Sequence, residues 1–261
     1  MHETDACANC LQPVAVAEQK FCPACGESTP AHRIDWHFIA HELEHSVLHM
    51  DRGILYTLKC LMLQPGELIR DYVEGRRRGI VKPLLLIMMM AALVAVLTRY
   101  GVGHDVMDAS LLAGAADGVR AGGNPGVARI AAIYTSVNQW MNLHFAASTL
   151  ILIPVEAAMF RLSFGRLGGL NYPEWLVITA FLTVQTFVLW VLSVPLHRSY
   201  PATMIWVVLA AMSYAIFTLI RFFKDQPWWK VTLRTLIGFG LFIVAQWIAM
   251  LMVVLWVLAS S

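Results

Sequence analysis

The stretch Thr232–Ala259, TLRTLIGFGLFIVAQWIAMLMVVLWVLA, decides the class of this protein because it carries a single charged residue, Arg234. A helix needs only about 20 mostly apolar residues to cross a bilayer. Similar runs precede it, at Pro83–Val102, Asn142–Phe164, Trp175–Leu196 and Thr203–Phe223. The 261-residue chain is 58% hydrophobic and 14% charged, whereas soluble proteins average about 25% charged residues. The sequence therefore predicts an all-α membrane protein, a bundle of about five transmembrane helices. Residues 127–141 could extend the second of these outside the bilayer.

Lysines and arginines are distributed unevenly about these runs. Fifteen of the 19 lie before the first run, at the end of the second run or just after it, or between the last residues of the fourth run and the first residues of the fifth. Cytoplasmic segments of membrane proteins are enriched in these residues, so the pattern predicts a cytoplasmic N-terminus and an outside C-terminus. Trp175 lies at a predicted helix end, where an amphipathic ring favours the interface. Residues 1–20 lack the apolar core of a secretory signal, so the first run is expected to target the chain.

Two Cys-x-x-Cys knuckles lie near the N-terminus, Cys7–Cys10 and Cys22–Cys25. Each knuckle lets two thiolates reach one ion, and two knuckles complete the four ligands of a closed structural zinc site. Disulfides or free thiols are the alternative, but a reducing cytoplasm favours metal binding. Leu11 occupies the position that is normally glycine, as Gly26 is in the second knuckle. The sequence predicts structural Zn²⁺ in a ribbon over residues 1–30.

Residues 31–82 are expected to form a cytoplasmic or interfacial helical region ahead of a transmembrane domain at 83–261. Gly53–Leu63 is apolar but too short to span, and it is predicted to lie along the inner leaflet as part of an amphipathic helical collar. Pro65 suits the start of the next helix. A basic cluster then precedes the first run and is expected either to contact anionic lipid headgroups or to anchor the topology. Its members are Arg76, Arg77, Arg78 and Lys82.

Four histidines recur at every fourth residue of a predicted helix, Ile34–Met50, and this spacing places them on one stripe. They are His37, His41, His45 and His49. The simplest interpretation is a solvated or headgroup-facing stripe that is partly protonated near neutral pH. A second metal site or a pH-responsive stripe is an alternative.

The segment HELEH at residues 41–45 matches the H-E-x-x-H pattern of zinc peptidases, in which Glu42 would be the general base. No spacing singles out a third ligand. The sequence therefore favours a non-enzymatic protein, and a membrane metallopeptidase is an alternative.

Glu156 lies two residues after Pro154 within the second predicted span. Ionisable groups at membrane depth are rare and mark paired sites or solute routes. Glu156 could snorkel, pair with Arg161, or line a route in a transporter or channel subunit. No inverted repeat supports a transporter, so a structural role is favoured. Other polar side chains, which could join helices by hydrogen bonds, are Asn142, His144, Gln185 and Gln246.

Residues 1–82 carry nine basic and eleven acidic residues, a net charge of −2. Nucleic-acid-binding domains present a basic surface, so the sequence favours a protein partner for the cytoplasmic head and no nucleic acid. The chain contains no phosphate loop, nucleophile elbow or dinucleotide fingerprint. These features predict a scaffold or adaptor in contact with membrane lipids, and an oligomer is compatible with this role.

Several motifs together resemble a known family. They are the two knuckles, followed by Asp51–Leu58, Gln64–Arg77 and Lys82-Pro83. The segment from Cys7 to Leu86 looks like a widespread bacterial family of zinc-ribbon, multi-spanning inner-membrane proteins of unknown function. The resemblance implies a fold and an inner-membrane location, and it assigns no catalytic residue.

Overall fold

The computed structural model describes residues 6–13, 21–27, 33–36, 53–98, 100, 125–165, 167–197 and 203–260. The elements in these ranges are α2 (Ile54–Leu63), α3 (Pro65–Val73), α4 (Pro83–Leu97), α6 (Pro125–Leu143), α7 (Phe145–Phe164), η2 (Leu167–Gly169), α8 (Tyr172–His197), α9 (Thr203–Phe222) and α10 (Trp228–Ala259). From residue 53 onward these elements are all helices, whereas the cysteine segments at 6–13 and 21–27 form turns, with an isolated β-bridge between Ala6 and Pro13. The predicted all-α class is confirmed.

Four of the described helices are long and apolar enough to cross a membrane: α7, α8, α10 and the part of α9 from Ile205. They support a multi-pass membrane protein. The first predicted span corresponds to α4, which has 15 residues. At 1.5 Å per residue α4 is about 22 Å long, shorter than the hydrocarbon core of about 30 Å. The described helices thus include four candidate spans and two shorter apolar helices, Ile54–Leu63 and α4, and residues 101–124 lie outside the described ranges.

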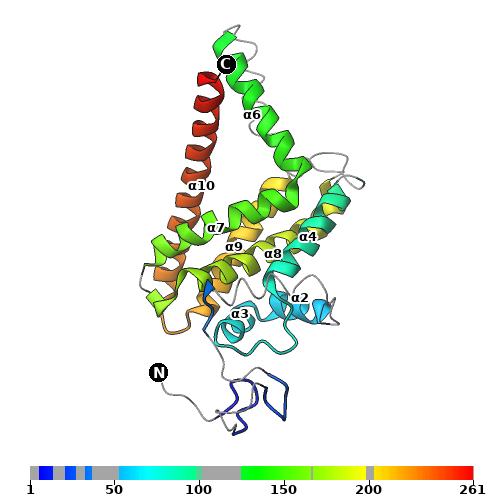
Figure 1. Ribbon diagram of the computed structural model, residues 1–261, viewed down its shortest axis with the longest axis vertical. Coiled ribbons are helices and arrows are strands. Elements are labelled where there is room, and N and C mark those ends of the chain that lie inside the picture. Colours follow the sequence, from blue (N-terminus) through cyan, green and yellow to red (C-terminus); the bar gives the residue numbers. More distant parts are fainter. Residues whose placement is uncertain are drawn as a thin grey trace.

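The second predicted span divides into two helices at His144. The backbone there leaves the helical region, with φ −110° and ψ 42°. The His144 ring stacks on Trp140 at 4.8 Å, at the point where the chain passes from α6 to α7. Figure 1 shows α6 leaving the bundle toward the C-terminal part of α10. Residues 127–141 therefore belong to a separate helix.

Helix α8 is the centre of the bundle and packs against α4, α7 and α9 (Figure 1). Its side chains Trp175, Ile178 and Phe181 are fully buried. Trp175 contacts Phe164 with ring centroids 4.9 Å apart, and Phe223 covers both rings. Trp175 lies near the start of α8, and its ring faces this aromatic cluster; its position at the membrane interface stays a prediction.

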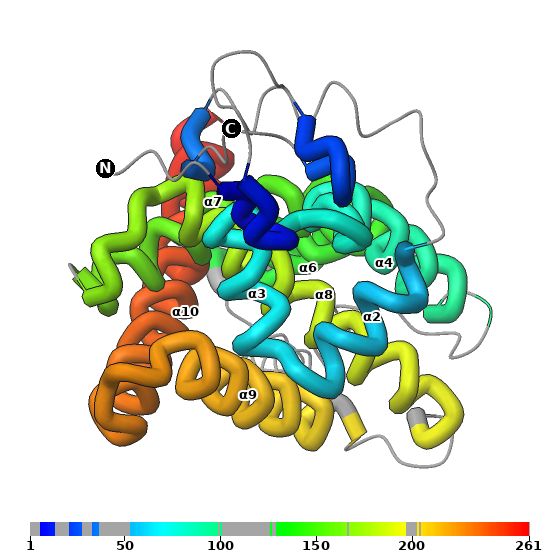
Figure 2. The backbone as a smooth tube through the Cα atoms, turned by 90° about the horizontal axis from the view of Figure 1, so that it is seen from below, coloured from blue at the N-terminus to red at the C-terminus, as the bar shows by residue number. Residues whose placement is uncertain are grey.

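The short helices α2 and α3 follow one another at an angle, and they pack against α8 and α9 (Figure 2). Tyr72 is buried against Phe181 in an edge-to-face contact at 5.4 Å. Gly66 lies so close to α9 that a Cβ atom there would overlap the backbone of Arg221 and Phe222. This close approach requires glycine at position 66. The Cys-containing segments and the C-terminal end of α10 lie at opposite ends of the molecule (Figure 1).

Candidate metal centre and its seat on the helical bundle

The two cysteine knuckles have the same backbone geometry. In the first, the amide of Cys7 donates to the carbonyl of Gln12 at 2.8 Å, and the amide of Leu11 donates to the carbonyl of Cys7 at 2.9 Å. In the second, Cys22 and Glu27 form the equivalent pair at 2.7 Å, and the amide of Gly26 donates back to Cys22 at 2.7 Å. Each knuckle therefore folds its two thiols toward the same side.

Leu11 and Gly26 occupy equivalent places in the knuckles and both have left-handed backbones, with φ 60° and φ 74°. Glycine adopts this conformation without penalty, whereas a leucine is strained there. Leu11 is 78% exposed, so packing offsets little of this strain. The place of Leu11 at the usual glycine position is confirmed, and it makes the first knuckle the weaker half.

The four cysteines converge. Their sulfur atoms all lie within 4.8 Å of one another. The Cys7 and Cys25 sulfurs are 3.5 Å apart, and those of Cys10 and Cys22 are 3.6 Å apart. A tetrahedral ion with bonds of about 2.3 Å needs sulfur–sulfur distances of about 3.8 Å. The four cysteines are free, so the arrangement can hold one metal ion in a shell of sulfur alone.

The pKa values of two of the thiols are shifted from that of a free cysteine. The backbone amide of Glu27 lowers the pKa of Cys25 to about 6. The backbone of Gln12 acts to lower the pKa of Cys10, but burial and the other cysteines outweigh it and raise this pKa to about 12. At neutral pH Cys25 is thus a ready thiolate, while Cys10 holds its proton until a metal ion displaces it.

The segment that follows the knuckles is fixed to the mouth of the bundle by Arg33. Its guanidinium donates to both carboxylate oxygens of Glu174, at 2.6 Å and 2.9 Å, and to the carbonyl of Gly169 at 2.6 Å. The side chain of Glu174 is only 4% exposed, and the ion pair raises the pKa of Arg33. The adjacent Ile34 is fully buried. We call residues 33–36 together with Gly169–Glu174 the seat.

Asn171 organises the bundle side of the seat. Its side chain accepts from the amide of Glu174 at 2.8 Å, and Glu174 accepts from the amide of Asn171 at 2.7 Å. This reciprocal pair is a capping box at the start of α8. The Asn171 amide group also donates to the carbonyl of Ile34 at 2.8 Å. One carboxylate therefore both caps α8 and holds Arg33, so the start of α8 and the head segment are fixed together.

Two arginines of the basic cluster, Arg76 and Arg77, interact with neighbouring residues of the protein. Arg76 pairs with Asp71 and Glu74, each at 2.5 Å. Arg77 donates to the carbonyl of Tyr72 at 3.0 Å and lies over its ring. Arg78 is exposed and forms no ion pair with the described residues. Lipid contact by this cluster, including Lys82, stays a prediction, and Arg78 is the member best placed for it.

The histidine stripe, His37, His41, His45 and His49, lies outside the described residues, as does the HELEH segment. Both the metal and the peptidase interpretations of these residues stay untested.

The C-terminal end of α2 is held by polar side chains from the bundle. Gln185, midway along α8, donates to the carbonyl of Leu61 at 3.2 Å, and Tyr214 of α9 donates to the carbonyl of Met62 at 2.6 Å. The hydroxyl of Thr218 donates to the Gln185 side-chain oxygen at 3.2 Å and orients it. The last carbonyls of a helix lack partners within it, and here the bundle supplies them. The end of α2, the first helix of the predicted collar, therefore contacts α8 at the middle of its length.

Glu156 lies on α7 between the helices of the bundle. Its carboxyl group lies near the Thr183 hydroxyl of α8, and no ion pair among the described residues includes it or Arg161. The predicted pairing with Arg161 is therefore not formed. Together with residues of α8, α9 and α10, Glu156 lines a cavity of about 330 Å³.

Arg33, Asn171, Glu174 and Tyr214 were not singled out from the sequence as site residues. The pattern Asn171-x-x-Glu174 before an apolar run is a recognisable capping signal. Nothing local indicates that Arg33 is its partner, because the two residues are 141 positions apart.

Residues 51–94 match the family described as "Protein of unknown function (DUF3667)". The match covers α2, α3 and most of α4, the part of the chain in which the collar packs on α8. The similarity confirms the resemblance to an uncharacterised family. No curated protein and no solved structure matches the chain.

Proposed function

We propose that this chain is a bacterial inner-membrane adaptor whose cytoplasmic head, folded around structural zinc, recognises another protein. The observation that carries the proposal is the coordination set of four sulfurs. An all-thiolate shell fills a tetrahedral zinc ion and leaves no position for substrate. A site of this kind stabilises a fold and performs no chemistry. Reduced cysteines also fit a cytoplasmic head.

The head offers a surface suited to a protein. Leu11 is 78% exposed and Phe21 is 64% exposed, one on each knuckle. Large apolar side chains presented on a small rigid unit are typical anchors of protein interfaces. The net negative charge of residues 1–82 opposes nucleic acid as the partner. The seat would hold this surface at the mouth of the bundle, so that partner binding takes place at the membrane.

Site-specific photocrosslinking in intact cells tests the proposal. A benzophenone side chain at Phe21 should crosslink a distinct protein, and Cys22→Ser should abolish this product because the knuckle loses its metal. A benzophenone at Trp140, which is on α6 and 50% exposed, is the control and should not give that product. A product of equal yield with and without Cys22 would contradict a zinc-folded recognition head.

A further inference from the structure

A cavity of about 330 Å³ lies among α7, α8, α9 and α10, a size within the usual range for small-molecule sites. It is open on the side of Val208 and Ile243, which are both exposed. Its walls are mainly apolar and include the rings of Phe239 and Phe242 of α10. Its polar groups come from α7 and α8, namely Thr149, Glu156, Thr183 and Thr186, and from Gln246 of α10. The cavity is therefore a largely apolar chamber with a small set of convergent polar atoms.

The three threonine hydroxyls offer acceptors to this chamber rather than donors. Thr149 donates its hydrogen to the carbonyl of Phe145 at 2.9 Å, and Thr183 donates to that of Thr179 at 2.9 Å. Thr186 donates to the carbonyl of Leu182 at 3.2 Å. A hydroxyl has one hydrogen and two lone pairs, so each oxygen has only acceptor capacity left for a ligand.

Glu156 gives the chamber a charge preference. It is the one acidic or basic side chain that lines the cavity, and no ion pair among the described residues neutralises it. A carboxylate is an acceptor when ionised, and a buried charge requires a partner of opposite sign. The aromatic walls also favour a cation. Charge and hydrogen-bonding capacity both select a positively charged donor.

We propose that this chamber binds an amphipathic organic amine in its ammonium form, with the N–H groups donating to the Glu156 carboxylate and the threonine oxygens. The apolar part of the amine packs against Phe239 and Phe242. A bare inorganic cation fits less well because it would need several oxygen ligands on all sides, and the opposite walls are apolar.

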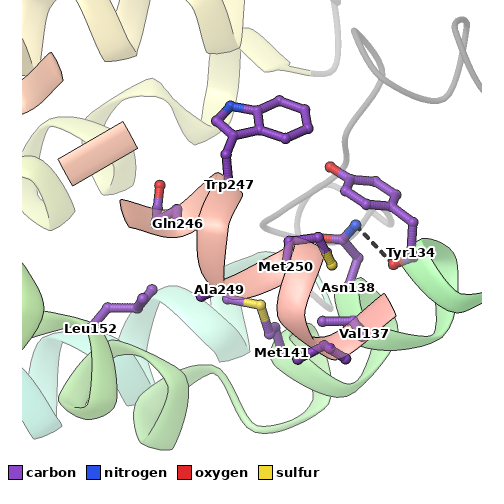
Figure 3. Close-up of a pocket in the computed structure, with 10 residues that line it drawn as sticks. Tyr134, Val137, Asn138, Met141, Leu152, Gln246, Trp247, Ala249 and Met250 are labelled. Atoms are coloured by element: carbon purple, nitrogen blue, oxygen red, sulfur yellow. Dashed lines mark hydrogen bonds between the residues drawn. The ribbon is translucent and has the colours of Figure 1, made fainter. Parts of the chain in front are cut away.

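A second cavity of about 350 Å³ adjoins this chamber. Leu152 and Gln246 line both cavities. Figure 3 shows these two residues on one side of the second cavity, with Tyr134 and Asn138 of α6 on the opposite side. The second cavity lies between α6 and α10 and has no acidic or basic lining residue. It extends the chamber for the apolar tail of a longer amine.

Equilibrium dialysis of the full-length protein in lipid nanodiscs tests the proposal, with 1-naphthylmethylamine as the probe and empty nanodiscs as the blank. The wild type should bind about one amine per chain saturably. Glu156→Gln should weaken binding by at least about tenfold, the factor of one charge-assisted hydrogen bond. Ala211→Phe fills the chamber but keeps the carboxylate, and it should also abolish binding. Glu74→Gln, which removes an exposed carboxylate outside the bundle, should bind as the wild type does.

The uncharged analogue 1-naphthylmethanol separates charge recognition from partition into apolar space. It should bind at least about tenfold more weakly than the amine, and Glu156→Gln should not change its binding. Equal binding of the amine to wild type and Glu156→Gln, or equal binding of amine and alcohol, would overturn the proposal. Displacement of the amine by sodium ions at millimolar concentration would also overturn it and assign the chamber to an inorganic cation.

Discussion

Arg33 and Glu174 are separated by 141 positions in the chain, yet the guanidinium of one donates two hydrogen bonds to the carboxylate of the other. The carboxylate is almost completely buried, and the arginine side chain is 52% exposed. The pair links the segment after the cysteine knuckles to the first turn of α8. It is the contact through which a metal-bound head would be held against the membrane helices.

A double-mutant cycle on Arg33→Ala and Glu174→Gln should give a coupling energy of about 1 kcal/mol, because half of the arginine is in solvent. Glu174→Gln should be the more harmful single change, since it also weakens the capping box with Asn171. Thermal unfolding in detergent measures these effects. Arg78→Ala should leave the unfolding temperature unchanged, and additive effects of the cycle would show that the ion pair does not contribute.

Exchanging the residue at the left-handed position of each knuckle should have opposite effects. Leu11→Gly should stabilise the metal-bound head by about 0.5 kcal/mol, since relief of strain exceeds the extra entropy of glycine. Gly26→Ala should destabilise it by about 1 kcal/mol, because open space surrounds the new Cβ atom and only the backbone is strained.

Competition with a chelator measures both changes as shifts in the concentration that releases half of the metal. Gln12→Gly is the control, because its backbone is not left-handed. If Leu11→Gly released metal more easily than the wild type, the two knuckles would not be equivalent.

Metal analysis of the detergent-purified protein should find one zinc ion per chain. Cys22→Ser should lose this ion, because removing one thiolate opens the four-sulfur shell. His41→Ala/His45→Ala should retain it in full. A second metal ion that disappears with the histidine changes would instead make the histidine stripe a metal site, and assays for proteolysis would follow.

Gln185→Leu should destabilise the protein by about 1–3 kcal/mol, because the carbonyl of Leu61 and the hydroxyl of Thr218 would lose a buried partner. Gln246→Leu is the matched control, since the same change on α10 breaks no hydrogen bond among the described residues. Thermal unfolding distinguishes the two variants. Equal unfolding temperatures would mean that Gln185 does not hold the end of α2.

Alkaline phosphatase fused after Ala259 should be active, because the charge distribution predicts that this end of α10 lies outside the cytoplasm. A fluorescent protein fused ahead of the knuckles should fold and fluoresce in the cytoplasm. This result requires an odd number of crossings and hence a crossing by α4 in addition to the four longer spans. An inactive phosphatase fusion would place both ends on one side and assign α4 to the inner leaflet.

The sequence predicted the helices of this protein well where each consists of one long apolar segment. The bounds of α8, α9 and α10 follow the predicted runs closely, because a long apolar segment has few alternatives to a membrane helix. The break at His144 was not predicted, since no proline or glycine marks it. At the break the His144 ring stacks on Trp140.

Among the residues that meet in space, some contacts were predicted from the sequence and others were not. The four cysteines were predicted as one site because the geometry of each knuckle is local, and their sulfurs do converge. The pairing of Arg33 with Glu174 was not predicted, because no pattern in the chain encodes the partner of an isolated charge. The same holds for Gln185, which the sequence marked as polar but whose contact with Leu61 follows only from the position of α2.

The sequence by itself thus determined the helical membrane class and the four-cysteine centre, because hydrophobic length and short ligand spacing act over a few residues. Only the tertiary structure decided that the collar lies halfway along α8, that Glu174 both caps α8 and binds Arg33, and that Glu156 faces a chamber lined with acceptors. These relationships depend on how helices from distant parts of the chain pack together, and packing satisfies buried polar groups wherever a suitable partner comes within reach.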